Sequence, residues 1–276
     1  MIALLRHYKL QEAIFLACVA IGVAACNGGG DANDDGVAAA QARIDSATLK
    51  VAVMPTIDCL PIYVAQHSGL FESESLMVSL VAYTAQMDCD TAIAGGTVQA
   101  MATDLVRGER LISQGTPLRY VAATDLQWQL LTGKKARIKQ LKQLDDKMVA
   151  MTRYSATDML ADRLVDSAGV ESERVFRIQV NDVGVRLNML LTGVMDAMLL
   201  PEPQATVARL LPANMVFDSA ADTLRMGVIA FSETALSDTL RRWQMEAFLR
   251  AYDAACDSIA HYGPAHYGDV ISQWCG

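Results

Sequence analysis

Short apolar runs alternate with helix-like segments along most of the chain from residue 49 onward. Runs rich in β-branched and other apolar residues occur at 49–54, 78–83, 98–102 and 118–123. Between them, residues 60–67, 87–94 and 104–113 have the spacing of apolar and polar positions expected of helices. Strands and helices that alternate at this rhythm are typical of a largely parallel sheet covered on both faces. The pattern therefore predicts an α/β fold.

The same design returns in the second half of the chain. Strands are expected at 147–151, 175–180 and 197–200, with helices at 156–167 and 185–191. The segments 96–101 and 193–198 match at an offset of 97 positions, and each leads from a helix through a glycine into a strand that begins Ala-Met. We therefore predict two similar α/β lobes, the first formed by 47–125 with 217–276 and the second by 126–216.

Three further segments connect or cover these lobes. Residues 126–133 are expected to form a crossover between the lobes, and the basic stretch 134–142 a helix-like approach to the second lobe. A strand is expected at 226–231. A long amphipathic helix then covers 237–261, where large apolar residues recur at helical spacing.

The N-terminus has the organisation of an export signal. Arg6 and Lys9 precede an uninterrupted apolar run at 13–25, which is too short to span a bilayer but suits a signal peptide. The run ends Val-Ala-Ala before Cys26, an arrangement similar to the lipobox of bacterial lipoproteins. We predict that 1–25 is a signal peptide, that Cys26 carries the lipid, and that the glycine-rich, acidic stretch 26–46 is a flexible tether. A plain secretory signal is the alternative.

Composition and charge exclude some classes of function. The chain is 52% hydrophobic and 20% charged, which favours a folded core over disorder. Its formal net charge is −8 without any basic block, so nucleic acid is not an expected partner. Cys59, Cys89, Cys256 and Cys275 do not have the spacing of metal ligands, and we expect neither a metal nor a cofactor. Disulfides within the pairs 59/89 and 256/275 remain open beside free thiols.

The loop 152–158 is the strongest candidate for a binding segment. Ligands of parallel α/β sheets bind beyond the carboxyl ends of strands, where helix N-termini offer free N–H groups. In this loop Arg153 would pair with an anion, Tyr154 would stack on a ring, and the Ser155 and Thr157 hydroxyls would donate hydrogen bonds. The alternative is that the two hydroxyls cap their own helix, and both roles are compatible.

Carboxylates follow several of the expected strands. Asp58, Asp104, Asp158 and Glu202 would ring a cleft and favour a ligand with an amine or ring N–H donors. The alternative for Asp104 and Asp158 is that they only stabilise helix N-termini, and for Glu202, between two prolines, that it lies in an exposed turn. The predicted ligand-binding residues are Thr56, Asp58, Thr103, Asp104, Arg153, Tyr154, Ser155, Thr157 and Glu202.

Several short motifs, in order, resemble one family. They are Leu-Lys-Val-Ala-Val-Met-Pro-Thr at 49–56, Pro-Ile-Tyr-Val-Ala at 61–65 leading to Gly-Leu-Phe at 69–71, the two glycine segments described above, the entry to the second lobe at 141–151, and Pro-Glu-Pro at 201–203. From residue 49 onward the chain resembles the NMT1/THI5-like group of ABC transporter solute-binding proteins, relatives of sulfonate-, nitrate-, taurine- and thiamin-precursor-binding proteins. The resemblance implies a type II periplasmic-binding-protein fold, in which a hinge joins two α/β lobes and the ligand lies in the cleft between them.

The function that the resemblance implies is that of the extracytoplasmic solute-binding component of an ABC importer. Such a protein captures a small polar molecule without transforming it. Its expected partners are that molecule, a transporter permease and the membrane that holds the lipid anchor, and it is expected to be a monomer. A ligand-binding sensor or scaffold lipoprotein is one alternative. A pyrimidine-precursor synthase-like enzyme is disfavoured because the chain has no cysteine cluster, no histidine after a lobe strand, and no G-x-S-x-G, H-E-x-x-H or P-loop motif.

Overall fold

The structure is a computed structural model that describes residue 37 and residues 43–221 and 224–276. The predicted signal peptide, Cys26 and most of the predicted tether lie outside the described residues. Residues 47–276 form one compact unit, which contains two sheets of five strands each. Among the described residues no helix is both long and apolar enough to cross a membrane.

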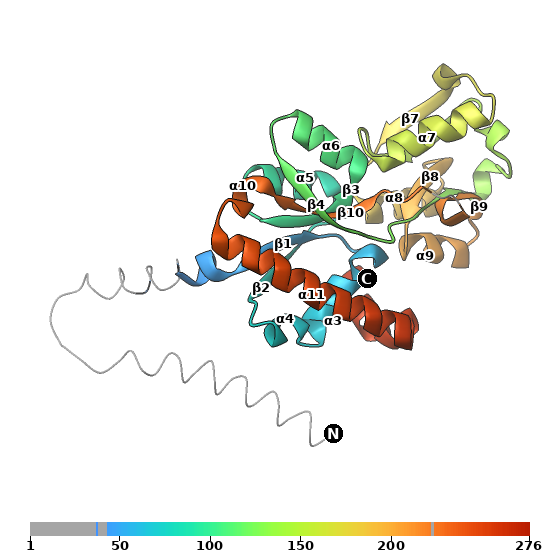
Figure 1. Ribbon diagram of the computed structural model, residues 1–276. Helices are drawn as coiled ribbons and strands as arrows, with labels where there is room; N and C mark the ends of the chain where they lie inside the picture. Colours follow the sequence, from blue (N-terminus) through green and yellow to red (C-terminus); the bar gives the residue numbers. More distant parts are fainter. Residues whose placement is uncertain (1–36, 38–42, 222–223) are drawn as a thin grey trace, which may run out of the picture. The chain divides into compact units, whose positions relative to one another are not determined.

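The first sheet has the strand order β2-β1-β3-β10-β4. Its strands are β1 (Leu49–Val53), β2 (Val78–Ala82), β3 (Ala100–Asp104), β4 (Leu118–Ala123) and β10 (Gly227–Ser232). The helices of this lobe are α3 (Leu60–His67), α4 (Leu70–Ser73), α5 (Gln86–Ala94), α6 (Leu105–Ser113), α10 (Glu233–Leu236), α11 (Thr239–Tyr262) and α12 (Gly268–Cys275). The long helix α11 packs along α3 and α4 (Figure 1).

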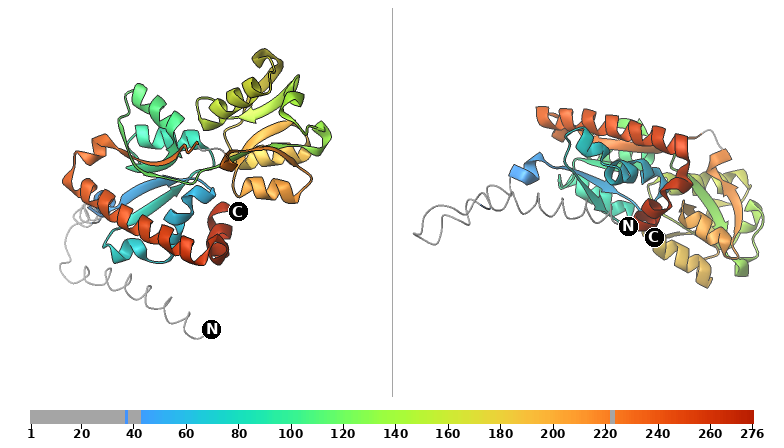
Figure 2. Two further views of the ribbon diagram at one scale, coloured as in Figure 1. Left: turned by 45° about the vertical axis from the view of Figure 1, so that its right-hand side comes forward. Right: turned by 90° about the horizontal axis from the view of Figure 1, so that it is seen from below.

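The second sheet repeats this plan with the order β7-β6-β8-β5-β9. Its strands are β5 (Trp128–Thr132), β6 (Lys147–Met151), β7 (Val175–Gln179), β8 (Ala197–Pro201) and β9 (Asn214–Asp218). Its helices are α7 (Ala156–Ser167), α8 (Val183–Thr192) and α9 (Gln204–Leu210). The two turned views in Figure 2 show the lobes side by side, each with its own sheet.

The repeated glycine segments occupy equivalent places in the two lobes. Gly96 and Gly193 both adopt left-handed backbone angles (φ 71° and 74°), which favour glycine because it lacks a Cβ atom. Each segment leads into a central strand, β3 or β8, in which every residue is buried. The two sheets with their own helices confirm the prediction of two α/β lobes.

The sheets are mixed, whereas the alternating pattern predicted largely parallel ones. Strand β10 runs antiparallel to β3 and β4, and β5 runs antiparallel to β8 and β9. Each of these strands is reached directly from the other lobe instead of through a helix on the face of its own sheet. The segment 126–133, expected to be only a crossover, therefore contains the fully buried strand β5.

The basic segment 134–142 does not form the expected helix. A single 3-10 turn at Lys134–Ala136 ends at Arg137, whose backbone is left-handed (φ 56°) and cannot continue a helix. The chain then extends until a second short turn at Leu141–Leu144. Ile138 and Leu144 are buried and anchor the segment, while its lysines stay at the surface.

Strand β9 extends beyond the expected limit of the second lobe. Phe217 and Asp218 pair with Leu130 and Gln129 of β5, which places them in the second sheet. Neither α9 nor β9 was predicted. The remaining limits of the lobes stay a prediction from the repeated pattern.

Apolar side chains form a core on each sheet. In the second lobe, alternate residues of β5, β6 and β8 belong to two different clusters, as expected for a sheet with both faces covered. In the first lobe the core contains a stack of Tyr63 on Trp274, with ring centroids 4.7 Å apart. All four cysteines of the described part are free, so neither conceivable disulfide is formed.

A candidate ligand cleft between the lobes

A small cavity of about 50 Å³ lies where the carboxyl ends of strands from both sheets meet. Six of the predicted site residues line it: Thr56, Asp58, Thr103, Asp104, Ser155 and Thr157. The first four follow β1 or close β3, and the last two open α7 of the other lobe. The sequence rule that ligands bind beyond strand ends therefore selected residues that the fold brings together.

Hydrogen bonds from backbone and side-chain groups join the two lobes directly around this cavity. The bonds are Ile57 N–H to the Glu202 carbonyl (2.9 Å), Gln204 Nε2 to the Pro55 carbonyl (2.8 Å), Val183 N–H to the Thr84 carbonyl (3.3 Å) and Ala156 N–H to Asp104 Oδ1 (3.0 Å). The structure is thus a closed arrangement of the lobes, which accounts for the small volume of the cavity.

Asp104 links the N-termini of two helices. Its Oδ1 accepts from the backbone N–H of Arg107 in its own helix α6 and from Ala156 N–H at the start of α7, both at 3.0 Å. Burial raises the pKa of this carboxyl to about 6, although the Arg107 guanidinium and both N–H donors oppose the rise. Asp104 therefore caps its own helix α6, which is the alternative that the sequence left open. It also accepts a hydrogen bond from the first turn of α7 on the other side of the cleft.

The Ser155 and Thr157 hydroxyls belong to a capping network. Ser155 Oγ donates to the Thr152 carbonyl (2.6 Å) and accepts from Thr157 N–H (3.1 Å). Thr157 Oγ1 accepts from Thr152 N–H at 2.9 Å. Both residues are buried and both line the cavity, so helix capping is present and contact with a ligand remains a proposal.

Arg153 and Tyr154 do not line the cavity. Tyr154 is 57% exposed, and the guanidinium of Arg110 from the first lobe lies 4.4 Å from its ring centroid. Arg153 lies in a separate surface depression beside Asp158 and Phe176. Tyr154 has a left-handed backbone (φ 58°), because the loop makes a tight turn there before α7 begins.

The expected ring of carboxylates is reduced to two members at the cavity. Asp158 accepts from Tyr154 N–H at 2.8 Å. Glu202 binds Arg209 Nη2 (3.0 Å), Gln129 Nε2 (3.3 Å) and Thr206 N–H (2.9 Å), and it does not line the cavity. Only Asp58 and Asp104 of the four predicted carboxylates line the cavity.

Asp58 is a buried acceptor with spare capacity. It lies in a 3-10 turn after β1, is 5% exposed, and its Oδ1 has no hydrogen-bond partner among the described residues. Burial raises its pKa to about 6, because a desolvated carboxyl favours its neutral form. The buried hydroxyl of Thr103 likewise has no partner in the described part of the chain.

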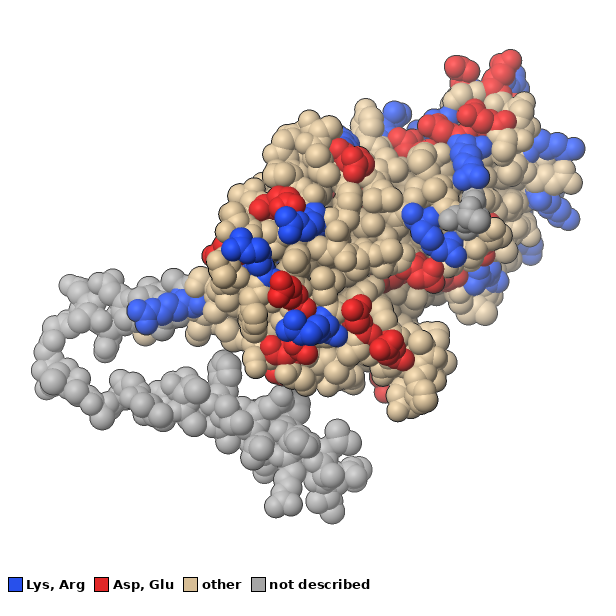
Figure 3. Space-filling view, in the orientation of Figure 1, with Lys and Arg blue, Asp and Glu red and all other residues tan. Residues whose placement is uncertain are grey.

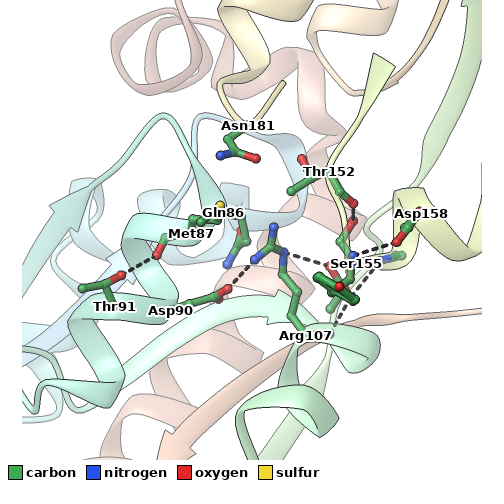
Figure 4. A network of polar contacts seen from close by, with 12 residues as sticks. Gln86, Met87, Asp90, Thr91, Arg107, Thr152, Ser155, Asp158 and Asn181 are labelled. Atoms are coloured by element: carbon green, nitrogen blue, oxygen red, sulfur yellow. Dashed lines mark hydrogen bonds and ion pairs between the residues drawn. The ribbon is translucent and has the colours of Figure 1, made fainter. Parts of the chain in front are cut away.

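Two buried arginines complete the wall, and sequence reasoning missed both. Arg107 on α6 is 2% exposed and forms an ion pair with Asp90, while its Nη2 has no partner within residues 43–221 and 224–276. Arg186 on α8 is 5% exposed; Nη1 donates to the Leu199 carbonyl at 2.8 Å and Nε is unpartnered in that same part. Figure 4 shows Arg107 reaching between Asp90 of its own lobe and the Ser155 loop.

Both arginines place a guanidinium group in the buried wall of the cavity. Burial and, to a smaller extent, the neighbouring positive charge of Arg107 together lower the pKa of the Arg186 guanidinium to about 10. At neutral pH Arg186 therefore remains charged. A signal existed in the sequence: Arg186 is the only charged residue of the otherwise uncharged helix Val183–Thr192. Within the described ranges no group of three histidine, cysteine or acidic residues is arranged to hold a metal.

Charged groups elsewhere are distributed as on an ordinary soluble surface. On the face drawn in Figure 3, acidic and basic side chains are interspersed over the first lobe. The ion pairs Arg119–Glu233 and Arg250–Glu74 of the first lobe are partly exposed, and pairs of this kind contribute little to stability. At the cavity, buried charge and polar atoms without partners in the described chain coincide, at Asp58, Arg107 and Arg186.

Comparison with solved structures shows the same fold in several binding proteins. The alkanesulfonate-binding protein SsuA from Xanthomonas axonopodis pv. citri, bound to MOPS, has a TM-score of 0.70 at 16% identity, over 82% of this chain and 78% of that one. SsuA from Escherichia coli gives 0.67 at 15% identity, over 82% and 78%. The nitrate-binding protein NrtA from Synechocystis PCC 6803 gives 0.66 at 15% identity, over 76% and 61%.

The sequence comparisons give a family. None of the curated proteins compared with the chain matches it. The family model described as NMT1/THI5 like matches residues 56–262, a span that contains both sheets from the loop after β1 onward and every residue that lines the cavity apart from Met54. The chain belongs to the NMT1/THI5-like family.

Proposed function

We propose that this protein is the extracytoplasmic solute-binding component of an ABC importer and holds a small polar molecule between its lobes without transforming it. One observation carries the proposal: the closed cavity between the lobes is walled by buried polar atoms that lack partners within the described residues. Such atoms are costly in a protein interior and are expected to be satisfied by a bound molecule.

The comparisons support the same role. The family model covers most of the chain, and the similar structures include binding proteins for alkanesulfonates and nitrate. Ligands of two-lobed proteins are enclosed when the lobes close around them. Lipid attachment at Cys26, with a transporter permease as partner, belongs to this proposal and rests on the sequence alone.

Binding without turnover is tested on the mature protein by fluorescence. Trp128 is buried and lines the cavity, so a bound solute should change its emission. Small polar compounds are titrated while emission is recorded, and the Trp128→Phe variant is the matched control, because the remaining tryptophans lie outside the cavity. We expect a saturable change in the parent protein and none in the control.

Recovery of the bound compound decides between carrier and enzyme. After release by denaturation, mass spectrometry should return the added compound unchanged and in stoichiometric amount. A product that accumulates with time would contradict the proposal. Absence of saturable binding by any compound, together with a native mass spectrum of the apoprotein alone, would contradict it as well.

A further inference from the structure

The wall of the cavity offers donors that its own residues leave unused. Arg186 hydrogen-bonds a backbone carbonyl through Nη1 and makes no ion pair in the described part of the chain, while its Nε is unpartnered. Arg107 has Asp90 and Asp104 as counter-charges, yet its Nη2 is also unpartnered. A buried guanidinium without a full set of acceptors is costly, and carboxylate, sulfonate or phosphonate oxygens match its geometry.

The same wall offers an acceptor that is equally unused. Asp58 Oδ1 is buried without a partner in the described chain, and Asp58 lies in the first lobe near the buried Thr103 hydroxyl, which is unpartnered as well. Asp104 is not available in the same way, since its Oδ1 already accepts two backbone N–H groups. The acceptor capacity of the cavity is therefore concentrated at Asp58, and a ligand N–H or ammonium group would satisfy it.

We infer that the cavity takes a small amphoteric ligand, whose anionic group binds Arg186 and Arg107 and whose amine or N–H donor binds Asp58. The inference rests on the proposed function and specifies its ligand class. The cavity volume of about 50 Å³ limits the ligand to a few heavy atoms, because pockets for drug-sized molecules are typically about 300–1,000 Å³. A ligand with an anionic group but no N–H donor would leave Asp58 without a hydrogen-bond partner. A ligand with an amine but no anionic group would leave the free N–H groups of both arginines without an acceptor.

Matched probe compounds separate the two ends of the ligand. Calorimetric titration at pH 7.5 compares β-alanine with propionate, 2-aminoethylphosphonate with ethylphosphonate, and 2-aminoethanesulfonate with ethanesulfonate, with ethylamine as the amine alone. In at least one pair we expect the amine-bearing member to bind about tenfold more tightly or better, since a hydrogen bond to a charged group has about that effect. Ethylamine should bind more weakly than the amine-bearing member of that pair.

Three variants assign the ends to residues. In Asp58→Asn the preference within the pair should fall to about twofold or less, while the amine-free probe keeps its affinity. In Arg186→Gln every anionic probe should lose about tenfold or more, and Arg186→Lys should recover part of that loss because it restores the charge. Arg119→Gln is the matched control, since Arg119 is an exposed, ion-paired arginine that does not line the cavity. Circular dichroism verifies the folding of each variant.

The outcomes distinguish this inference from the proposed function. Any of three results would overturn the inference. The tenfold preference for the amine-bearing probe could survive in Asp58→Asn, the amine-free probes could bind as tightly or more tightly, or none of the probes could bind. If the probes fail while native mass spectrometry shows another small molecule bound, the proposed function stands and only the ligand class is wrong. If no small molecule binds at all, both fail.

Discussion

Single residues at the cavity show how far sequence reasoning reaches. Asp58 and Asp104 were selected because they follow strands, and strand ends meet at one edge of a sheet whatever the details of packing. Arg107 and Arg186 were missed because a cation within a helix is ordinarily solvated. Their burial depends on partners such as Asp90 and the Leu199 carbonyl, which are near only in the folded chain. Arg153, by contrast, was selected for its chemistry and lies outside the cavity.

The Asp58 carboxyl should make stability depend on pH in a defined direction. Folding raises its pKa from 3.8 to about 6, so the folded state binds the proton more tightly, and stability falls as pH rises from about 4 through about 6. The amide of an Asp58→Asn variant does not titrate. We therefore expect the unfolding free energy of the variant minus that of the parent protein to be about 2 kcal/mol larger at pH 7.5 than at pH 4.5. Urea unfolding at both pH values measures this, and a difference independent of pH would contradict it.

The capping role of Ser155 is separable from any role in binding. Replacing an N-cap serine by alanine costs about 0.5–2 kcal/mol, so Ser155→Ala should lower the unfolding free energy by about 1 kcal/mol. Ser167→Ala, at the other end of α7, removes a hydroxyl that only donates to the Leu164 carbonyl, and it should change stability by less than about 0.5 kcal/mol.

Binding measurements on the same two variants complete this test. If Ser155 contacts the ligand, Ser155→Ala also weakens binding by about tenfold, whereas Ser167→Ala does not. Lowered stability with unchanged affinity would show that Ser155 is a helix cap alone. Equal stability losses in both variants would contradict the capping argument.

At the scale of elements, the repeat of strand, helix, glycine and strand identified both lobes correctly. Local patterns carry this information because β1–β3 and β6–β8 join neighbours through short helices, so each unit is contiguous in sequence. Strand β10 was predicted at 226–231 within the first lobe, whereas the segment that contains β5 was expected to be only a crossover. For both strands the direction of pairing was missed. Their antiparallel pairing is fixed by the path of the chain between lobes, which no local pattern encodes.

Gly227 opens β10 at the point where the chain returns from the second lobe. A Cβ atom there would lie 2.2 Å from Thr124 Oγ1 and 2.5 Å from Leu126 Cβ, on the other connection between the lobes. We therefore expect Gly227→Ala to lower the unfolding free energy by about 1–3 kcal/mol. Gly268→Ala is the control, since nothing lies within 4 Å of its Cβ position and its backbone is helical; it should be neutral or stabilising by up to about 1 kcal/mol. Equal effects in chemical unfolding would contradict the crowding argument.

At the scale of the whole molecule, the two lobes form one compact unit and the predicted lipid anchor precedes it. The sequence was sufficient to predict the fold. It also indicated that the candidate site lies at the carboxyl ends of the strands in each sheet. The closed contacts between the lobes did not follow from the sequence, because some of them join residues as distant along the chain as Ile57 and Glu202 through backbone atoms that every residue type possesses.

The anchor makes a prediction that fractionation can test. If Cys26 carries lipid, the protein expressed in a bacterial host partitions with membranes, and Cys26→Ser shifts most of it to the soluble fraction because the membrane affinity resides in the acyl chains. Cys256→Ser is the control, as it replaces a free cysteine of the folded unit and should leave the protein in the membrane fraction. Mass spectrometry of the mature N-terminus should find a modified Cys26. A soluble mature chain that begins at another residue would contradict the prediction.

The hydrogen bonds that join the lobes around the cavity also have a kinetic consequence. If a solute enters by separation of the lobes, these bonds break first, and opening becomes a step that precedes productive encounter. The observed rate of association then rises with solute concentration only up to the opening rate and levels off there. Release of the solute is limited by the same opening rate. The residence time of the solute therefore depends on the rate of lobe opening as well as on the binding affinity.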